Sequence, residues 1–250
     1  MQNPDLSLIL ACYNEETILE KSLEEIIKIL DSATFTYEII LVDDCSRDET
    51  RKVIHMLLLK YKERSMRKIF HEKNMGRGRT VTDGFRIARG DIVGFIDVDL
   101  EVHARYIPSF VLAIKKGADV ALGSRKYKLQ LKPAPIYRYL LSRGYAFLVR
   151  KMLKIKLTDT ECGFKFFKRM KIFPILDETE NQRWFWDTEV MARAYYRGLQ
   201  IVEIPCIFSR RSDKPSTVRL IPDVTDYFRE LCRFRKHFLR KIRNSASLYG

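Results

Sequence analysis

Three acidic side chains follow an apolar run near the middle of the sequence. Residues 92–96 are β-branched or aromatic apart from one glycine, which is typical of a buried strand in a parallel sheet. Asp97, Asp99 and Glu101 then occupy every second position, a spacing that turns alternate side chains to one side of an extended chain. Clustered carboxylates repel one another unless a cation lies among them, and oxygen ligands suit Mg²⁺ or Mn²⁺ better than Zn²⁺. The pattern predicts a divalent metal site at these three residues, with a solvated acidic turn as the alternative.

Polar residues also follow two earlier apolar runs. Residues 6–10 are followed by Tyr13 and Glu15, and residues 38–42 are followed by Asp44. In open α/β sheets the carboxyl ends of the parallel strands meet at one edge, where ligands bind. Carboxylates at such an edge can accept hydrogen bonds from the N–H and hydroxyl groups of a ligand. These residues therefore extend the predicted site to the ends of the first two strands.

The elements between these motifs predict how the motifs meet. Apolar residues at helical spacing occupy residues 16–30, and similar spacing recurs after residue 50 and from Gly76 to about residue 88. Strands and helices that alternate at roughly 25 to 30 residues per unit indicate βαβ units, a parallel sheet and right-handed crossovers. The turn Gly76-x-Gly78 is too short for a dinucleotide fingerprint, and a P-loop motif is absent. Dehydrogenase and P-loop ATPase functions are therefore disfavoured.

The charge of the chain is unevenly distributed. The net charge is +14 over 250 residues, and residues 125–156 carry ten Lys or Arg without an acid. Residues 209–250 carry eleven Lys or Arg against four acids, so the rest of the chain is slightly acidic. Concentrated positive charge attracts polyanions, which here means nucleic acid, phosphorylated lipid or an anionic bilayer.

Both basic segments contain apolar residues at helical spacing. Residues 136–154 and 222–243 each predict a basic amphipathic helix, a type that lies on anionic membranes. Ordinary helices with a solvated basic face are the alternative. No apolar run reaches the ~18 residues of a membrane span, and the N-terminus has no signal peptide pattern. Five cysteines without Cys-x-x-Cys spacing favour a reducing compartment, so we expect a peripheral protein on the cytoplasmic face of a membrane.

Seven motifs in a fixed order give the chain a family resemblance over roughly residues 6–220. The first five resemble the family 2 glycosyltransferases with the GT-A fold: Tyr13-Asn14-Glu15, Val42-Asp43-Asp44-x-Ser46, Asn74-x-Gly76-Arg77-Gly78, Asp97-x-Asp99 and Gly123-Ser124-Arg125. The last two are similar to dolichyl-phosphate glucose and mannose synthases and their bacterial polyprenyl-phosphate relatives: Asp159-Thr160-Glu161-Cys162-Gly163-Phe164-Lys165-Phe166-Phe167 and Trp184-Phe185-Trp186-Asp187-Thr188-Glu189. The resemblance implies a mostly parallel α/β GT-A sheet flanked by helices, with a C-terminal basic amphipathic helix. It places the catalytic domain in residues 1–208, and an acceptor loop with a membrane-docking tail in 209–250.

The resemblance also implies roles for the strand-end residues. Tyr13 would pack beside the base of a nucleotide-sugar, and Glu15 and Asp44 would accept hydrogen bonds from the base and ribose. A guanidinium fork matches phosphate oxygens, so Arg125 would face the diphosphate. The metal, Mg²⁺ or Mn²⁺, would be held by Asp97, Asp99 and Glu101. The complete donor set expected from the resemblance is Tyr13, Glu15, Asp44, Arg77, Asp97 and Arg125.

Another group of residues is expected to act on the acceptor. Asp159 and Asp187 compete for the role of base or acceptor-positioning group. A phosphate acceptor needs little help from a base, because its second pKa of about 6 leaves it largely ionised at neutral pH. Positively charged side chains in the loop after residue 209 suit the task of holding it, although Lys214 stands where relatives have glycine. The expected phosphate ligands are Arg210, Arg211, Lys214 and Ser216, and the expected catalytic residues are Asp99, Asp159, Asp187 and Arg211.

These observations predict an inverting glycosyltransferase that moves one sugar from a UDP- or GDP-sugar to dolichyl or polyprenyl phosphate. Its expected partners are the donor, the lipid acceptor and an anionic membrane surface, and a membrane-protein partner is left open. A family 2 enzyme acting on a soluble or protein hydroxyl is the alternative enzyme, and it would need an aspartate base. A basic nucleic-acid-binding protein is the non-enzyme alternative. It is disfavoured because it leaves the acidic cluster without a purpose.

Overall fold

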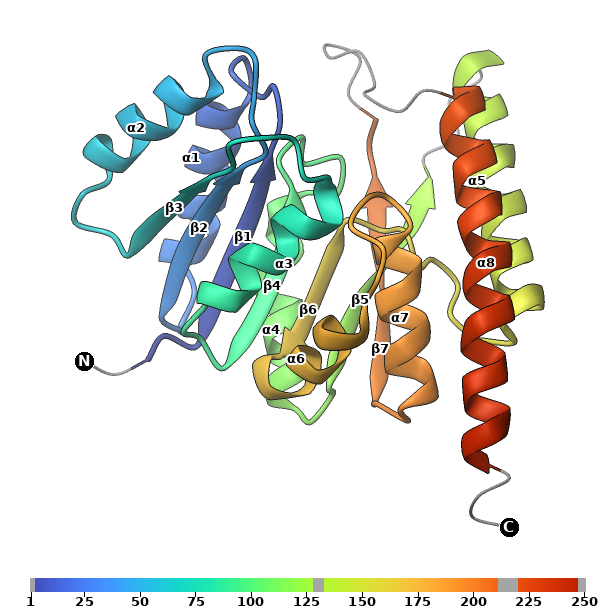
Figure 1. Cartoon of the computed structure of the whole chain (residues 1–250). Coiled ribbons are helices and arrows are strands. Elements are labelled where there is room, and N and C mark those ends of the chain that lie inside the picture. Colours follow the sequence, from blue (N-terminus) through green and yellow to red (C-terminus); the bar gives the residue numbers. More distant parts are fainter. Residues whose placement is uncertain (1–2, 128–132, 211–219, 247–250) are drawn as a thin grey trace.

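The computed structural model describes residues 3–127, 133–210 and 220–246, with side chains described from residue 140 in the second range and for 225–238 in the third. Within these ranges, seven strands form one sheet in the order β3-β2-β1-β4-β6-β5-β7 (Figure 1). The strands are β1 (Leu6–Cys12), β2 (Tyr37–Asp43), β3 (Met66–Phe70), β4 (Ile92–Asp97), β5 (Val120–Tyr127), β6 (Phe164–Lys168) and β7 (Ile201–Phe208).

The sheet is mostly parallel, as the sequence predicted. Every neighbouring pair is parallel except the two pairs formed by β6, which runs antiparallel to β4 and β5. The strand order reverses between β1 and β4, and α/β sheets bind ligands at such a switch point. The acidic residues after β4 therefore lie where the topology favours a site.

Helices cover both faces of the sheet. They are α1 (Leu19–Asp31), α2 (Thr50–Lys60), α3 (Arg77–Ile87), α4 (Ile107–Lys115), α5 (Pro133–Leu153), α6 (Arg169–Glu178), α7 (Trp186–Tyr196) and α8 (Leu220–Ala246), with a 3₁₀ turn at Ala104–Tyr106. The apolar side chains of α1, α2 and α4 pack with one face of the sheet, and those of α3, α6 and α7 pack with the other. Alternation along β1 supplies both cores, because Leu8 and Leu10 enter the first and Ile9 enters the second.

Two long helices occupy the segments in which basic helices were predicted. In Figure 1, α5 and α8 run side by side at one end of the sheet. Tyr145 of α5 packs against Tyr227 of α8, with ring centroids 5.1 Å apart. Leu231 and Phe234 of α8 are buried in the core that α7 shares. Among the helices of the described ranges, none combines the length and apolar character needed to cross a bilayer.

Candidate active site

A pocket lies at the carboxyl ends of β4 and β5. Its lining consists of Asp97, Asp99, Glu101, Val102, Arg125, Gly163 and Phe208. The three acids predicted to hold a metal thus line one pocket together with Arg125, the cation predicted to face a diphosphate. The pocket combines the charges that a nucleotide diphosphate and its divalent counter-ion require.

The acids of this pocket repel one another. Burial, followed by the nearby charges of Asp97 and Glu101, raises the pKa of Asp99 to about 7. A bound cation would relieve this repulsion, so the donor set fits a divalent metal. Within the described ranges, no three His, Cys, Asp or Glu side chains form a group that could hold a metal ion in the arrangement seen here.

The backbone around the acids is tightly turned. The N–H of Leu100 donates to the carbonyl oxygen of Asp97 at 3.2 Å, and Leu100 has a φ of +52°. Asn14 and Cys45, in the loops after β1 and β2, also have positive φ values, of 56° and 60°. Residues held in this conformation are often found at ligand sites. Three of the four non-glycine residues with positive φ in the described ranges follow strands at the predicted edge, and the fourth, Lys154, follows the helix α5.

Gly163 fixes the place of Asp97. The Asp97 N–H donates to the Gly163 carbonyl oxygen at 3.0 Å. A Cβ atom on Gly163 would lie 1.7 Å from Oδ2 of Asp97. Only glycine therefore leaves room for the carboxylate in its present position.

The end of β7 contacts the loop after β4 that carries Asp99 and Glu101, here called the acidic loop. Val102 and Phe208 form an isolated antiparallel bridge, and the Ser209 N–H donates to the Glu101 carbonyl oxygen at 2.8 Å. Arg210 reaches the same residue, with 4.0 Å between its Nε and Oε1 of Glu101. This places Arg210 beside the pocket. The other predicted phosphate ligands, Arg211, Lys214 and Ser216, lie outside the described residues.

Asp159 is fully engaged with Arg125. Its two carboxylate oxygens accept hydrogen bonds from Nε and Nη2 of Arg125 at 2.7 and 2.8 Å. Burial is the largest single influence and would raise the pKa of Asp159, but the charge and hydrogen bonds of Arg125, together with the charge of Lys165, hold that pKa below its ordinary value. Asp159 is therefore an ionised partner that orients Arg125. Among the described residues, the Arg125 guanidinium makes no further hydrogen bond, so its other N–H groups can bind another anion.

Asp187 is engaged with two cations. It is 3% exposed, and it accepts hydrogen bonds from Lys165 on one oxygen and Arg77 on the other. Arg77 also pairs with Asp97, 2.6 Å from its Nη2 to Oδ1. Both aspartates predicted as candidate bases are thus held in ion pairs.

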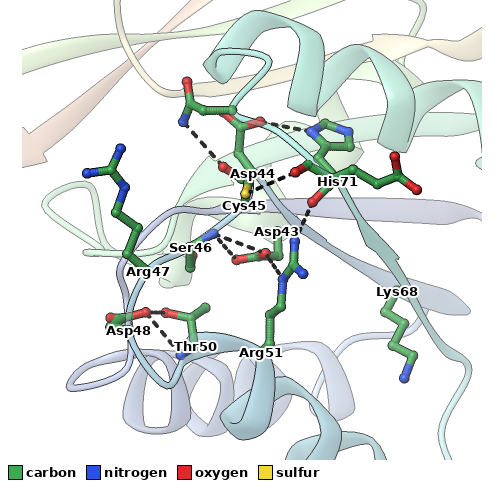
Figure 2. A network of polar contacts seen from close by, with 12 residues as sticks. Asp43, Asp44, Cys45, Ser46, Arg47, Asp48, Thr50, Arg51, Lys68 and His71 are labelled. Atoms are coloured by element: carbon green, nitrogen blue, oxygen red, sulfur yellow. Dashed lines mark hydrogen bonds and ion pairs between the residues drawn. The ribbon is translucent and has the colours of Figure 1, made fainter.

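The loop after β2 is a network of polar contacts (Figure 2). Asp44 is 4% exposed, and its carboxylate accepts hydrogen bonds from the N–H groups of Met75 and Gly76 at 2.7 and 2.9 Å. The ring Nδ1 of His71 lies 2.8 Å from the same carboxylate. The carboxylate oxygens of Asp44, which were predicted to contact a nucleotide base, therefore bind the backbone at the start of α3 in this structure. Asp44 links the loop after β2 to Arg77, the first residue of α3.

The loop after β1 is bonded to the same network. The Asn14 N–H donates to Oγ of Ser46 at 2.9 Å, and the Glu15 N–H donates to Oγ1 of Thr50 at 2.8 Å. Glu15 is also among the charges that raise the pKa of Asp99, which places it within electrostatic reach of the pocket. Tyr13 and Glu15 are partly exposed. Tyr13 and Glu15, which were predicted to bind the nucleotide-sugar, thus lie on the same edge of the sheet as the acids.

Sequence reasoning missed two charged residues near the pocket. Lys165 is completely buried in the middle of the sheet. The sequence feature that could have identified it is the presence of a lysine within the aromatic run Phe164-Lys165-Phe166-Phe167. Burial, with the charges of Asp159 and Asp187 adding to it, raises the pKa of Glu161 to about 7 against the opposing effect of Arg125. Glu161 had no distinguishing signal beyond its place between two predicted aspartates.

The parallel sheet with its acidic switch-point pocket defines a GT-A type of nucleotide-binding fold. The chain belongs to glycosyl transferase family 2, because the model described as "Glycosyl transferase family 2" matches residues 7–173. The resemblance inferred from the motifs is therefore confirmed.

Several individual proteins are similar to this chain over more residues than the family model covers. The chain is 32% identical over 216 residues to the dolichyl-phosphate beta-glucosyltransferase of Homo sapiens, covering 80% of this chain and 65% of that protein. It is 30% identical over 235 residues to the dolichol-phosphate mannosyltransferase of Pyrococcus furiosus, covering 92% and 64%. It is 31% identical over 223 residues to glycosyltransferase AglD of Haloferax volcanii, covering 88% and 35%. The chain thus spans between about a third and just under two thirds of the length of these relatives.

Solved structures share the fold at lower identity. The mannosyltransferase PcManGT from Pyrobaculum calidifontis, in complex with GDP-Man and Mn²⁺, matches with a TM-score of 0.58 and 17% identity, covering 85% of this chain and 59% of that one. Glucosyl-3-phosphoglycerate synthase from Mycobacterium tuberculosis, solved with Mn²⁺, UDP and glucosyl-3-phosphoglycerate, matches with a TM-score of 0.66 and 18% identity, covering 92% and 77%. The predicted GT-A fold is confirmed by these likenesses.

Proposed function

We propose that this chain transfers a single sugar, with inversion, from a UDP- or GDP-sugar to a dolichyl-type polyprenyl phosphate. The observation that carries the proposal is the pocket that sets Asp97, Asp99 and Glu101 together with Arg125. Two relatives that are at least 30% identical support the lipid acceptor, since they are a dolichyl-phosphate beta-glucosyltransferase and a dolichol-phosphate mannosyltransferase.

The donor half of the mechanism rests on charge placement. Asp159 fixes the guanidinium of Arg125 by two hydrogen bonds, so its other N–H groups are preorganised for a diphosphate. Asp99 and Glu101, with Asp97, would hold Mg²⁺ or Mn²⁺. When bound, such an ion neutralises the charge that develops on the departing nucleotide. Tyr13 and Glu15 border the same edge and would contact the nucleoside.

The acceptor half is supported by the ion pairs of Asp159 and Asp187. Neither carboxylate is positioned to take a proton, because cations occupy both oxygens of each. A phosphate acceptor with a second pKa of about 6 is largely ionised at neutral pH and needs only to be held in line. Arg210 lies beside the pocket for that task, and Arg211, Lys214 and Ser216 follow it in the sequence.

The helix pair α5 and α8 supports a membrane location. Both helices contribute side chains to the core, but both also expose large apolar side chains. The exposed ones are Leu140, Phe147, Leu148 and Phe228. Exposed cations accompany them: Arg143, Lys151, Arg229, Arg233, Arg235 and Lys236. This combination suits the interface of an anionic bilayer, on its cytoplasmic face in our proposal. Sedimentation with vesicles tests it: binding to anionic vesicles should weaken with salt, and equal binding to neutral vesicles would contradict the electrostatic attachment.

The proposed activity is tested with a panel of UDP- and GDP-sugars. Each is incubated with the full chain, a short-chain polyprenyl phosphate and Mg²⁺ or Mn²⁺, and products are read by mass spectrometry. A glycosylated lipid phosphate is expected with one nucleotide class. Release of nucleotide without glycosylated lipid across the whole panel would reject this acceptor.

A hydroxyl acceptor is the second candidate, and Glu161 favours it. Its pKa is raised to about 7, and it makes no hydrogen bond or ion pair with the residues that the structure describes. A carboxylate in that state suits general-base catalysis near neutral pH. The same donor panel is repeated with a soluble alcohol in place of the lipid phosphate, and transfer to that alcohol, lost in Glu161→Gln, would establish this candidate.

A further inference from the structure

Lys165 is a buried cation in the middle of the sheet. It lies on β6, opposite Phe95 of β4, and is 0% exposed. Its ammonium donates to Oδ1 of Asp187 at 2.5 Å and to the Cys162 carbonyl oxygen at 2.6 Å. It also lies 5.2 Å from the ring centroid of Phe95. Burying an ammonium costs several kcal/mol unless its partners compensate, so these contacts define what Lys165 does.

Asp187 connects Lys165 to Arg77. It belongs to the first turn of α7, where the helix dipole favours a negative charge. Its second oxygen accepts a hydrogen bond from Nη1 of Arg77. The charge of this one buried carboxylate is therefore shared between two cations that come from different parts of the chain.

Arg77 continues the chain of contacts to Asp97. Its Nη2 and Nε donate to Oδ1 of Asp97 at 2.6 and 3.2 Å. The guanidinium lies 5.1 and 5.8 Å from the ring centroids of Phe95 and Trp184. The two rings and the carboxylates of Asp97 and Asp187 together fix the orientation of the Arg77 guanidinium. Asp97 is thereby held on one oxygen by Arg77 and packed on the other against Gly163.

We propose that Lys165 is a positioning residue for the donor site. It acts through the relay Lys165–Asp187–Arg77–Asp97, in which cations and anions alternate. While Lys165 takes part of the Asp187 charge, Arg77 binds Asp187 through one nitrogen and has two left for Asp97. Without Lys165, both oxygens of Asp187 attract the Arg77 fork, since bidentate pairing of arginine with a carboxylate is strongly favoured. Arg77 then withdraws from Asp97, and the pocket loses the orientation of one acid. This inference rests on the proposed function only in that the pocket takes a nucleotide diphosphate with a divalent metal.

The test uses the full chain and Lys165→Met, which removes the charge and keeps much of the apolar stem. Calorimetry measures the binding of UDP and, separately, GDP in the presence of Mn²⁺. We expect about ten-fold weaker binding by Lys165→Met, the range seen when a partner that orients a metal ligand is removed. Lys165→Arg keeps the cation and should bind within about three-fold of the wild type. Circular dichroism confirms that each variant is folded.

A double variant separates positioning from packing. In Lys165→Met with Asp187→Asn the carboxylate charge that would draw Arg77 away is gone, so Arg77 remains on Asp97 and nucleotide binding recovers relative to Lys165→Met. A role in packing alone predicts that the double variant binds no better. Arg193→Met is the matched control, because Arg193 is buried on α7 and pairs with Glu189 at 2.7 Å, away from the relay. It should lower stability without changing nucleotide affinity.

A nucleotide-independent measurement completes the test. The Arg77 Nε–H cross-peak, assigned in ¹⁵N spectra, should move in Lys165→Met and return in the double variant. Wild-type nucleotide affinity in Lys165→Met would overturn the relay. Failure of the wild type to bind either nucleotide would count against the proposed function. The relay would then be judged by the cross-peak, and an unchanged cross-peak in Lys165→Met would overturn it.

Discussion

Replacement of Gly163 by alanine tests the geometry of the pocket directly. The new Cβ would lie 1.7 Å from Oδ2 of Asp97, whereas non-bonded heavy atoms are comfortable at about 3.5 Å. The carboxylate, the strand or both must therefore move by more than about 1 Å. A misplacement of about 1 Å at a catalytic site can cost about 100-fold in rate. We expect kcat/KM for sugar transfer to fall by about that factor or more in Gly163→Ala.

The assay follows product by mass spectrometry, and calorimetry measures the binding of Mn²⁺ with UDP or GDP. Gly144→Ala is the matched control, because its added Cβ would have no atom of the described residues within 4 Å apart from its own helix backbone and chain neighbours, and alanine suits the helix α5 better than glycine. That control should keep wild-type kinetics. Gly163→Ala with wild-type turnover and wild-type metal–nucleotide affinity would refute the placement of Asp97 against Gly163.

Three further predictions address the metal, the pH response and the acceptor. Asp99→Ala should lower turnover by roughly 100-fold or more, as should chelation of the wild type, and full activity in excess chelator would contradict a metal-dependent reaction. Because folding raises the pKa of Glu161 from 4.5 to about 7, the native state holds a proton that the unfolded chain has lost, so this residue lowers stability as pH rises across that interval. Glu161→Gln should therefore raise the melting temperature more at pH 8 than at pH 5, and an equal change at both would contradict the shifted pKa. Arg211→Ala should damage transfer to polyprenyl phosphate more than Asp187→Asn, with the larger rise in KM for the lipid, because a charge-assisted hydrogen bond is worth roughly 1.5–3 kcal/mol. The reverse order would favour a hydroxyl acceptor.

The parts of the fold that local patterns determine could be predicted from the sequence. Alternating apolar and helical runs predicted the parallel half of the sheet, and the strand-end rule placed Asp97 at its carboxyl edge. The expectation for Arg125 came from the family resemblance instead. The antiparallel strand β6 was missed because its run Phe164-Lys165-Phe166-Phe167 is short and carries a charge. That lysine is compatible with a central strand only because Asp187, 22 residues later, returns to it. Such pairings depend on tertiary structure, which no local period encodes.

Asp44 illustrates a second limit of sequence reasoning. Its position after β2 placed it at the carboxyl edge of the sheet, but the N–H groups that its carboxylate binds lie 31 and 32 residues away, in the loop before α3. The sequence does not indicate whether a carboxylate will accept hydrogen bonds from water, from a ligand or from a backbone amide. Burial is what distinguishes these cases, and burial follows from how the loops after β2 and β3 meet.

The contact between Ser209 and Glu101 has a thermodynamic consequence. It joins the acidic loop, which we assign to the donor, to the segment that leads into the proposed acceptor loop. If binding at one of these sites changes the affinity of the other, the coupling free energy is the same in both directions. We therefore expect that any gain in lipid-phosphate affinity caused by bound nucleotide is matched by an equal gain in nucleotide affinity caused by the lipid.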